Sequence, residues 1–114
     1  MIDRNEFNAN FQYFDKEAVA EIIDLFIREH PGRFETLQRN LEEKDFDRLF
    51  QNAHSLKGTL SNFMDPVSLE LVREFERRAK ERSEEGISEL FSKVRTSTTE
   101  LVQDLELIRK ELNT

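Results

Sequence analysis

The sequence predicts an all-α protein, an antiparallel up-and-down four-helix bundle with a short additional N-terminal helix, and three observations support this. Apolar residues make up 37% and charged residues 36% of the 114 residues, a mixture that favours helices. Only three glycines and two prolines are available for turns. Apolar residues recur at spacings of three and four along four long segments. At this length we expect a single domain over residues 1–114.

The first element is expected over residues 3–13. Phe7, Phe11 and Phe14 are spaced by four and three residues, which places them on one side of a short amphipathic helix. We expect this helix to cover one end of the bundle.

The second element is a long helix with an interruption. Asp15 can cap its N-terminus, and apolar residues continue at helical spacing to about Glu29. The His-Pro-Gly sequence at 30–32 should kink or briefly break the helix, because proline disfavours α geometry in the preceding residue. The apolar stripe then continues to about Glu43. We assign His30 to this interruption and to no function.

The third helix is expected over residues 46–63, after a turn at Lys44 and with Asp45 as its N-cap. It contains Gly58, and an interior glycine costs a helix about 1 kcal/mol relative to alanine. Such a glycine indicates that another group approaches the backbone closely. The predicted buried stripe consists of Phe46, Leu49, Ala53, Leu56, Leu60 and Phe63.

Two further helices complete the predicted bundle. Asp65 and Pro66 mark the start of the fourth, since aspartate caps well and proline fits the first helical position. The polar run 80–85 should end it. The last helix is expected over residues 87–112, with a bend at 96–99, where threonine and serine weaken the helical pattern.

Composition argues against several classes of function. A net charge of −7 and a pI near 4.9 disfavour a nucleic-acid binder, which needs basic patches. No cysteine is present for disulfides or thiolate metal sites. No apolar run approaches the roughly 20 residues of a membrane helix, and the first residues do not resemble a signal peptide. We therefore expect a cytoplasmic protein without membrane attachment.

One histidine stands out on the third predicted helix. At about 100° per residue, His54 lies off the apolar stripe, and Gly58 follows it one turn later on the same flank. The sequence therefore predicts an exposed imidazole beside bare backbone.

The stretch Ala53-His54-Ser55-Leu56-Lys57-Gly58 resembles the signature of histidine-containing phosphotransfer (HPt) domains. Members of that family relay phosphoryl groups between receiver domains in multistep two-component signalling. The resemblance extends to the order of the segments: a short opening helix, a long kinked helix, the histidine helix and two closing helices. It implies a four-helix bundle with the reactive histidine exposed midway along one helix.

The resemblance also implies a role for each residue around the imidazole. His54 would accept the phosphoryl group, because a neutral imidazole offers an accessible lone pair. Lys57 would meet the phosphoryl oxygens with its charge, and Gly58 would leave clearance for the partner. Family members commonly orient the ring with a polar residue on the next helix, and an ungapped alignment from His54 puts that position at Glu76.

A docking patch for a receiver domain is expected around His54. Phe50 precedes it by one turn and lies beside the apolar stripe, so it can contribute partly exposed apolar area. The alternative is that Phe50 only borders the core. The other predicted members of the patch are Asp47, Gln51, Ser55, Ser61 and Asn62.

The sequence departs from the family at Met64, where other members often have glycine. A left-handed backbone conformation would be strained for methionine. We therefore expect the junction between the third and fourth helices to be shaped differently in this chain.

These observations predict a phosphoryl carrier without autonomous kinase activity. It would accept the group from a receiver aspartate on His54 and pass it to another receiver, so its partners would be response-regulator receiver domains, hybrid histidine kinases or both. One alternative is direct phosphorylation by a histidine kinase, and another is a helical interaction module without phosphotransfer. No metal, nucleotide or other cofactor is expected, since one histidine and a distant glutamate do not make a metal site. We expect a monomer.

Overall fold

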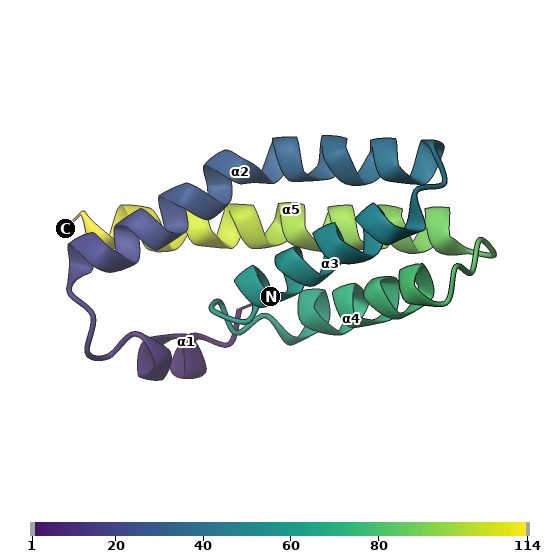
Figure 1. The fold of residues 1–114 in the computed structure, drawn as a ribbon. Coiled ribbons are helices and arrows are strands. Elements are labelled where there is room, and N and C mark those ends of the chain that lie inside the picture. Colours follow the sequence, from purple (N-terminus) through teal and green to yellow (C-terminus); the bar gives the residue numbers. More distant parts are fainter. Residues whose placement is uncertain (1, 114) are drawn as a thin grey trace.

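The computed structural model describes residues 2–113, which form five helices (Figure 1). No strand occurs within these residues, so the all-α prediction is confirmed. No helix among them is long and apolar enough to cross a membrane. The helices are α1 (Arg4–Asn10), α2 (Lys16–Glu42), α3 (Phe46–Leu60), α4 (Pro66–Lys80) and α5 (Ile87–Leu112).

The four longer helices surround one apolar core. α2 and α4 each pack against both α3 and α5, so the contacts form a closed ring. α2 and α5 have 27 and 26 residues, whereas α3 and α4 have 15 each, and the longer pair extends past the shorter one at one end (Figure 1). Phe34, Phe63 and Phe75 are among the largest fully buried side chains. The phenylalanines therefore serve mainly to fill this core.

Aspartate side chains start four of the five helices. Each accepts a hydrogen bond from the backbone amide three residues later, at 2.7 to 3.2 Å. Such a cap satisfies a free amide at the helix start and contributes about 1 kcal/mol. The predicted caps at Asp15, Asp45 and Asp65 are confirmed. The donors to Asp3, Asp15, Asp45 and Asp65 are the amides of Glu6, Ala18, Arg48 and Ser68.

α2 is continuous, so of the two outcomes predicted for residues 30–32, a kink or a short break, the break does not occur. Pro31 cannot donate to the carbonyl of Ile27, and Figure 1 shows the helix changing direction about halfway along. His30 Nε2 lies 2.9 Å from Thr98 Oγ1, which links this part of α2 to α5. Tertiary packing therefore maintains the helix across residues that disfavour it.

α5 is uninterrupted through the serine and threonine residues at 96–99. Ser97 and Thr98 are buried, and Thr98 Oγ1 donates to the carbonyl of Val94 at 2.9 Å. The predicted bend is not visible in Figure 1. Burial and these hydrogen bonds offset the weak helix propensity of the segment.

The junction between α3 and α4 differs from the prediction in two respects. α3 ends at Leu60 rather than at Phe63, and the Ser61 hydroxyl donates to the carbonyl of Gly58 at 2.6 Å. Met64 adopts the left-handed conformation, with φ of 55°, that we expected methionine to avoid. That conformation costs roughly 1–3 kcal/mol, and the bond from the Asp3 amide to the Met64 carbonyl at 2.8 Å helps to hold it.

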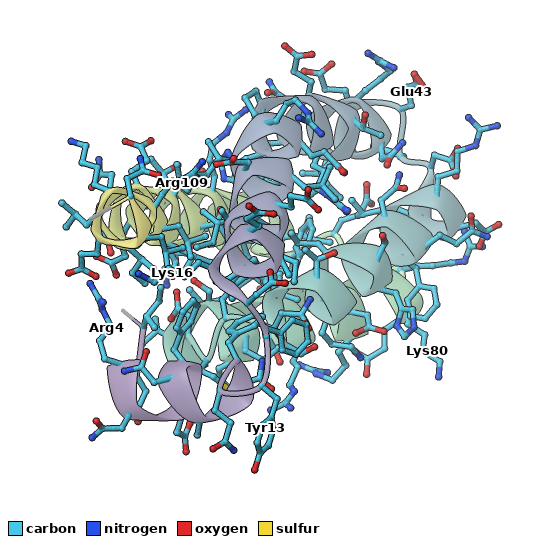
Figure 2. All side chains as sticks on the ribbon, turned by 90° about the vertical axis from the view of Figure 1, so that its left-hand side faces the viewer. Arg4, Tyr13, Lys16, Glu43, Lys80 and Arg109 are labelled. Atoms are coloured by element: carbon cyan, nitrogen blue, oxygen red, sulfur yellow. The ribbon has the colours of Figure 1, made fainter. Side chains whose placement is uncertain are left out.

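α1 lies against this junction at one end of the bundle, and it is shorter than the predicted range 3–13. Phe7 and Phe11 are buried, whereas Phe14, which we expected on the same apolar side, is 49% exposed. Asn10 Nδ2 donates to the carbonyl of Asn62 at 3.2 Å. In Figure 2 this end of the molecule faces the viewer, with α1 below α2 and with Tyr13 directed into solvent.

Candidate functional site

His54 lies just past the middle of α3, and 63% of its side chain is exposed. Its Nδ1 atom is 2.7 Å from Oε1 of Glu76 on α4. An ionised carboxylate only accepts hydrogen bonds, so Nδ1 carries a proton, and in the neutral imidazole Nε2 then keeps the free lone pair. The predicted pairing of these two residues is present in the fold, and it leaves one ring nitrogen available for reaction.

Each of the two carboxylate oxygens of Glu76 is bonded to a side chain of α3. Only 11% of its side chain is exposed, and its second oxygen, Oε2, lies 2.6 Å from Nζ of Lys57. Burial pushes the pKa of Glu76 upward and is the largest single influence. The hydrogen bonds and charges of Lys57 and His54 together outweigh it, so the pKa lies below its ordinary value. The carboxylate is therefore ionised at neutral pH, as an acceptor for Nδ1–H requires.

Lys57 takes part in this cluster through the carboxylate. The sequence suggested that its ammonium group would meet phosphoryl oxygens, and in the structure that group forms an ion pair with Glu76. About a third of the side chain, 31%, is exposed. His54, Lys57 and Glu76 thus form one connected charge cluster between α3 and α4.

Gly58 follows His54 by one helical turn on the exposed surface of α3. A Cβ atom built there would meet no atom within 4 Å outside its chain neighbours and the adjoining helix backbone. The packing of this chain therefore does not require a glycine at this position. The bare backbone instead leaves the surface beside the imidazole open.

Phe50 lies beside His54 on the other side, half-buried. The two rings stack with centroids 6.0 Å apart and planes inclined by 22°. Next to them is a shallow hollow of about 270 Å³ between α3 and α4. Lys80, one turn after Glu76 on α4, lines it and was not among the predicted members of the docking patch. Phe46, Asp47, Phe50, Gln51, Ala79 and Lys80 form the hollow.

The other predicted members of the docking patch fall into two groups. Asp47 and Gln51 border the hollow beside Phe50, and Asp47 pairs with Arg82 at 2.7 Å. Ser55 instead lies toward α2, where its Oγ accepts from Arg33 at 3.3 Å. Ser61 and Asn62 belong to the turn after α3.

Arg33 is a further residue near the cluster that the sequence did not single out. It reaches from α2 to Ser55 and to Thr59 on α3. No local pattern distinguishes it from the other arginines, because its position depends on how α2 packs against α3.

No group of three or more histidine, cysteine, aspartate or glutamate side chains among residues 2–113 is arranged to hold a metal ion. The His54 cluster has one imidazole and one carboxylate, and both oxygens of that carboxylate are already bonded. The arrangement is suited to holding an imidazole in one tautomer and orientation.

Comparison with protein families gives one match. The family model described as "Hpt domain" matches residues 21–112, which include α3, α4 and α5 and most of α2. Neither the search of curated proteins nor that of solved structures gave a match.

Proposed function

Because the chain belongs to the Hpt domain family, a family of histidine phosphotransfer modules in phosphorelays, we propose that His54 is its phosphoacceptor. His54 takes a phosphoryl group from the aspartyl phosphate of one receiver domain and passes it to the aspartate of another. The observation that carries this proposal is the 2.7 Å bond between Nδ1 of an exposed imidazole and a buried carboxylate.

The transfer step follows from that bond. The Nε2 lone pair attacks phosphorus, the bond between phosphorus and the aspartyl oxygen breaks, and the receiver carboxylate leaves with the electron pair. No proton has to leave Nε2, because the ring proton is on Nδ1. The ring becomes positive as the bond forms, and the negative charge of Glu76 stabilises it. Return of the group to an aspartate follows the same path in reverse.

Lys57 contributes its positive charge at the same centre. In the unphosphorylated protein the ammonium group of Lys57 is bonded to Glu76, the same carboxylate that bonds to His54. When three phosphoryl oxygens are present on Nε2, the ammonium group can turn toward them and form charge-assisted hydrogen bonds. The carboxylate is then free to interact with the positive ring alone.

The surface beside His54 suits a protein partner. Gly58 leaves room for the edge of an active site, and the hollow beside Phe50 offers apolar area with Gln51 and Asp47 at its border. Such a partner supplies the aspartate and the magnesium ion that receivers use. We extend the patch to Ser55, Ser61 and Asn62 along the same helix and the turn that follows it.

Each of the four longer helices packs against two of the others, and the connections between successive helices are short. Both features support the antiparallel up-and-down arrangement predicted for these helices. We propose that this bundle is one domain and acts as a monomer. A monomer leaves the His54 face open to each partner in turn.

The test is transfer of labelled phosphate to the purified protein. We expect acid-labile label to appear on the protein after incubation with phosphorylated receiver domains, and to disappear when an unphosphorylated cognate receiver is added. Label that comes only from a histidine kinase would identify a direct kinase substrate. If no receiver and no kinase transfers label, the protein is an interaction module and the proposal is wrong.

A further inference from the structure

A hollow of about 460 Å³ lies between α2 and α3, on the side of α3 that faces α2. Its volume is in the range of roughly 300–1,000 Å³ that small-molecule sites occupy in proteins. It is separate from the cluster of His54, Lys57 and Glu76. Its polar and backbone lining comes from Arg28, Glu29, Gly32, Arg33 and Thr36 of α2 and from Asn52 of α3.

One strip of α2 forms an open wall of this hollow. Arg28, Gly32 and Thr36 are spaced by four residues, so they follow one another along the same side of the helix. A Cβ atom at Gly32 would meet no atom within 4 Å outside its chain neighbours and the adjoining helix backbone, so packing against other elements does not account for this glycine. The strip therefore has a guanidinium group at one end, a hydroxyl group at the other and bare backbone between them.

The guanidinium group of Arg33 lacks good hydrogen-bond acceptors. Its three hydrogen bonds, to Ser55, Glu29 and Thr59, measure 3.3, 3.4 and 3.4 Å, which is long for N–H donors. Its Nε atom is buried, and no acceptor among residues 2–113 lies within bonding distance of it. A buried donor without a partner costs free energy that a better acceptor would recover.

The charges around the hollow favour an anion. Arg28 is exposed and forms no ion pair with any residue that the structure describes. Glu29 is the one carboxylate in the lining, against the two guanidinium groups of Arg28 and Arg33. The hollow is thus locally positive in a chain with a net charge of −7.

We propose that this hollow binds a small molecule that carries an oxyanion group, either a phosphate or a carboxylate. Arg28 and Arg33 supply the charge, and Thr36 and Asn52 supply further hydrogen bonds. Arg33 turns from its long contacts toward the ligand, which replaces them with shorter charge-assisted bonds and gives Nε a partner. Gly32 allows the ligand to lie against the helix backbone. The site does not depend on phosphoryl transfer by His54.

The proposal is tested by titrating the ¹⁵N-labelled full chain with inorganic phosphate and, separately, with succinate, at constant ionic strength maintained with sodium chloride. We expect saturable shifts of the amide signals of Gly32, Arg33 and Asn52 with at least one of the two anions. The anion that binds more tightly identifies the preferred group. Shifts that do not saturate, or that match those from sodium chloride alone, would overturn the proposal.

Two pairs of variants locate the site. Arg28→Gln should weaken binding by about tenfold or more, because a charged hydrogen-bond partner is lost, whereas Arg73→Gln on α4 should leave the affinity unchanged. Gly32→Ala leaves most of the hollow open and should bind, whereas Gly32→Leu fills the hollow and should not. Both Gly32 changes favour the helix, so folding is retained and can be checked by circular dichroism. Wild-type affinity in Arg28→Gln and Gly32→Leu would place any bound anion elsewhere.

Discussion

The two histidines of this chain have opposite surroundings. His54 is exposed on α3, and its partner is the carboxylate of Glu76. His30 is half-buried in α2, its ring centroid lies 4.6 Å from that of Phe34, and its partner is the hydroxyl of Thr98. The same side chain is therefore placed once at a surface and once within the packing between helices.

The two imidazoles differ both in burial and in the sign of the nearest charge. The carboxylate of Glu76 lies beside the His54 ring, where it could stabilise the positive charge that the proposed phosphorylation of Nε2 would create. At His30, burial and then the charge of Arg95 lower the pKa of the imidazole, so positive charge is disfavoured there. The proposed reactivity of His54 thus rests on the environment of its ring and on its exposure.

The strongest test of the comparison replaces each histidine, in separate variants, with glutamine. His54→Gln should abolish acid-labile labelling by phosphorylated receivers, because the only nucleophilic nitrogen of the proposed site is removed. His30→Gln should retain labelling at nearly the wild-type rate. Both are measured with the same donor and with circular dichroism as the check of folding. Acid-labile label on His54→Gln would contradict the assignment of the phosphoacceptor.

Removing the carboxylate should make His54 behave more like an ordinary surface histidine. We expect Glu76→Ala to slow labelling roughly 10- to 100-fold, the usual loss when an orienting partner is removed, with the fold intact. Glu76→Gln keeps an acceptor for Nδ1–H but lacks the charge, so its rate should lie between those of Glu76→Ala and the wild type.

A second measurement distinguishes an orienting role of Glu76 from a purely structural one. The ¹⁵N chemical shifts of the His54 ring report the tautomer, and in Glu76→Ala the preference for a proton on Nδ1 should decrease. Unchanged labelling rates and an unchanged tautomer would remove Glu76 from the mechanism.

Lys57 should have a smaller effect, because it contributes charge and does not hold the ring. Lys57→Gln is expected to slow labelling about tenfold, the loss of one charge-assisted hydrogen bond, and Lys57→Arg should recover part of it. Lys93→Gln on α5 is the matched control, since it removes an exposed charge from a hollow lined by Val67 and Leu71, to which no residue of the His54 cluster contributes. Equal rates in Lys57→Gln and Lys93→Gln would show that Lys57 does not act on the phosphoryl group.

Local sequence signals predicted most of the fold. Apolar spacing and the capping residues Asp15, Asp45 and Asp65 identified the helices and most of their starts, because both act over a single helical turn. Tertiary contacts decided the exceptions. α2 continues through Pro31, and Met64 adopts a left-handed conformation, because distant residues hold these segments in place.

In the candidate site too, local spacing predicted some features and tertiary packing decided the others. The spacing on α3 placed His54, Lys57 and Gly58 together, and the register between α3 and α4 brought Glu76 to the imidazole. The ion pair between Lys57 and Glu76 could not be read from the sequence, because a lysine side chain can take many directions at one backbone position. The position of Arg33 likewise depends on how two helices pack.

The smallest expected effect concerns His30 and appears in stability rather than in transfer. The pKa of His30 in the folded protein lies below its ordinary value of 6.5, so the unfolded chain binds a proton more readily. The contribution of neutral His30 to the free energy of unfolding is therefore complete above about pH 6.5. It is lost as the pH falls toward the pKa of His30 in the folded protein. We expect the free energy of unfolding, measured in urea, to decrease between pH 7.5 and pH 5.5, a range about one unit either side of the ordinary histidine pKa. His30→Gln should show a smaller decrease over this interval, because its amide can still reach Thr98 but does not titrate. An equal decrease in both proteins would assign the pH dependence to other groups.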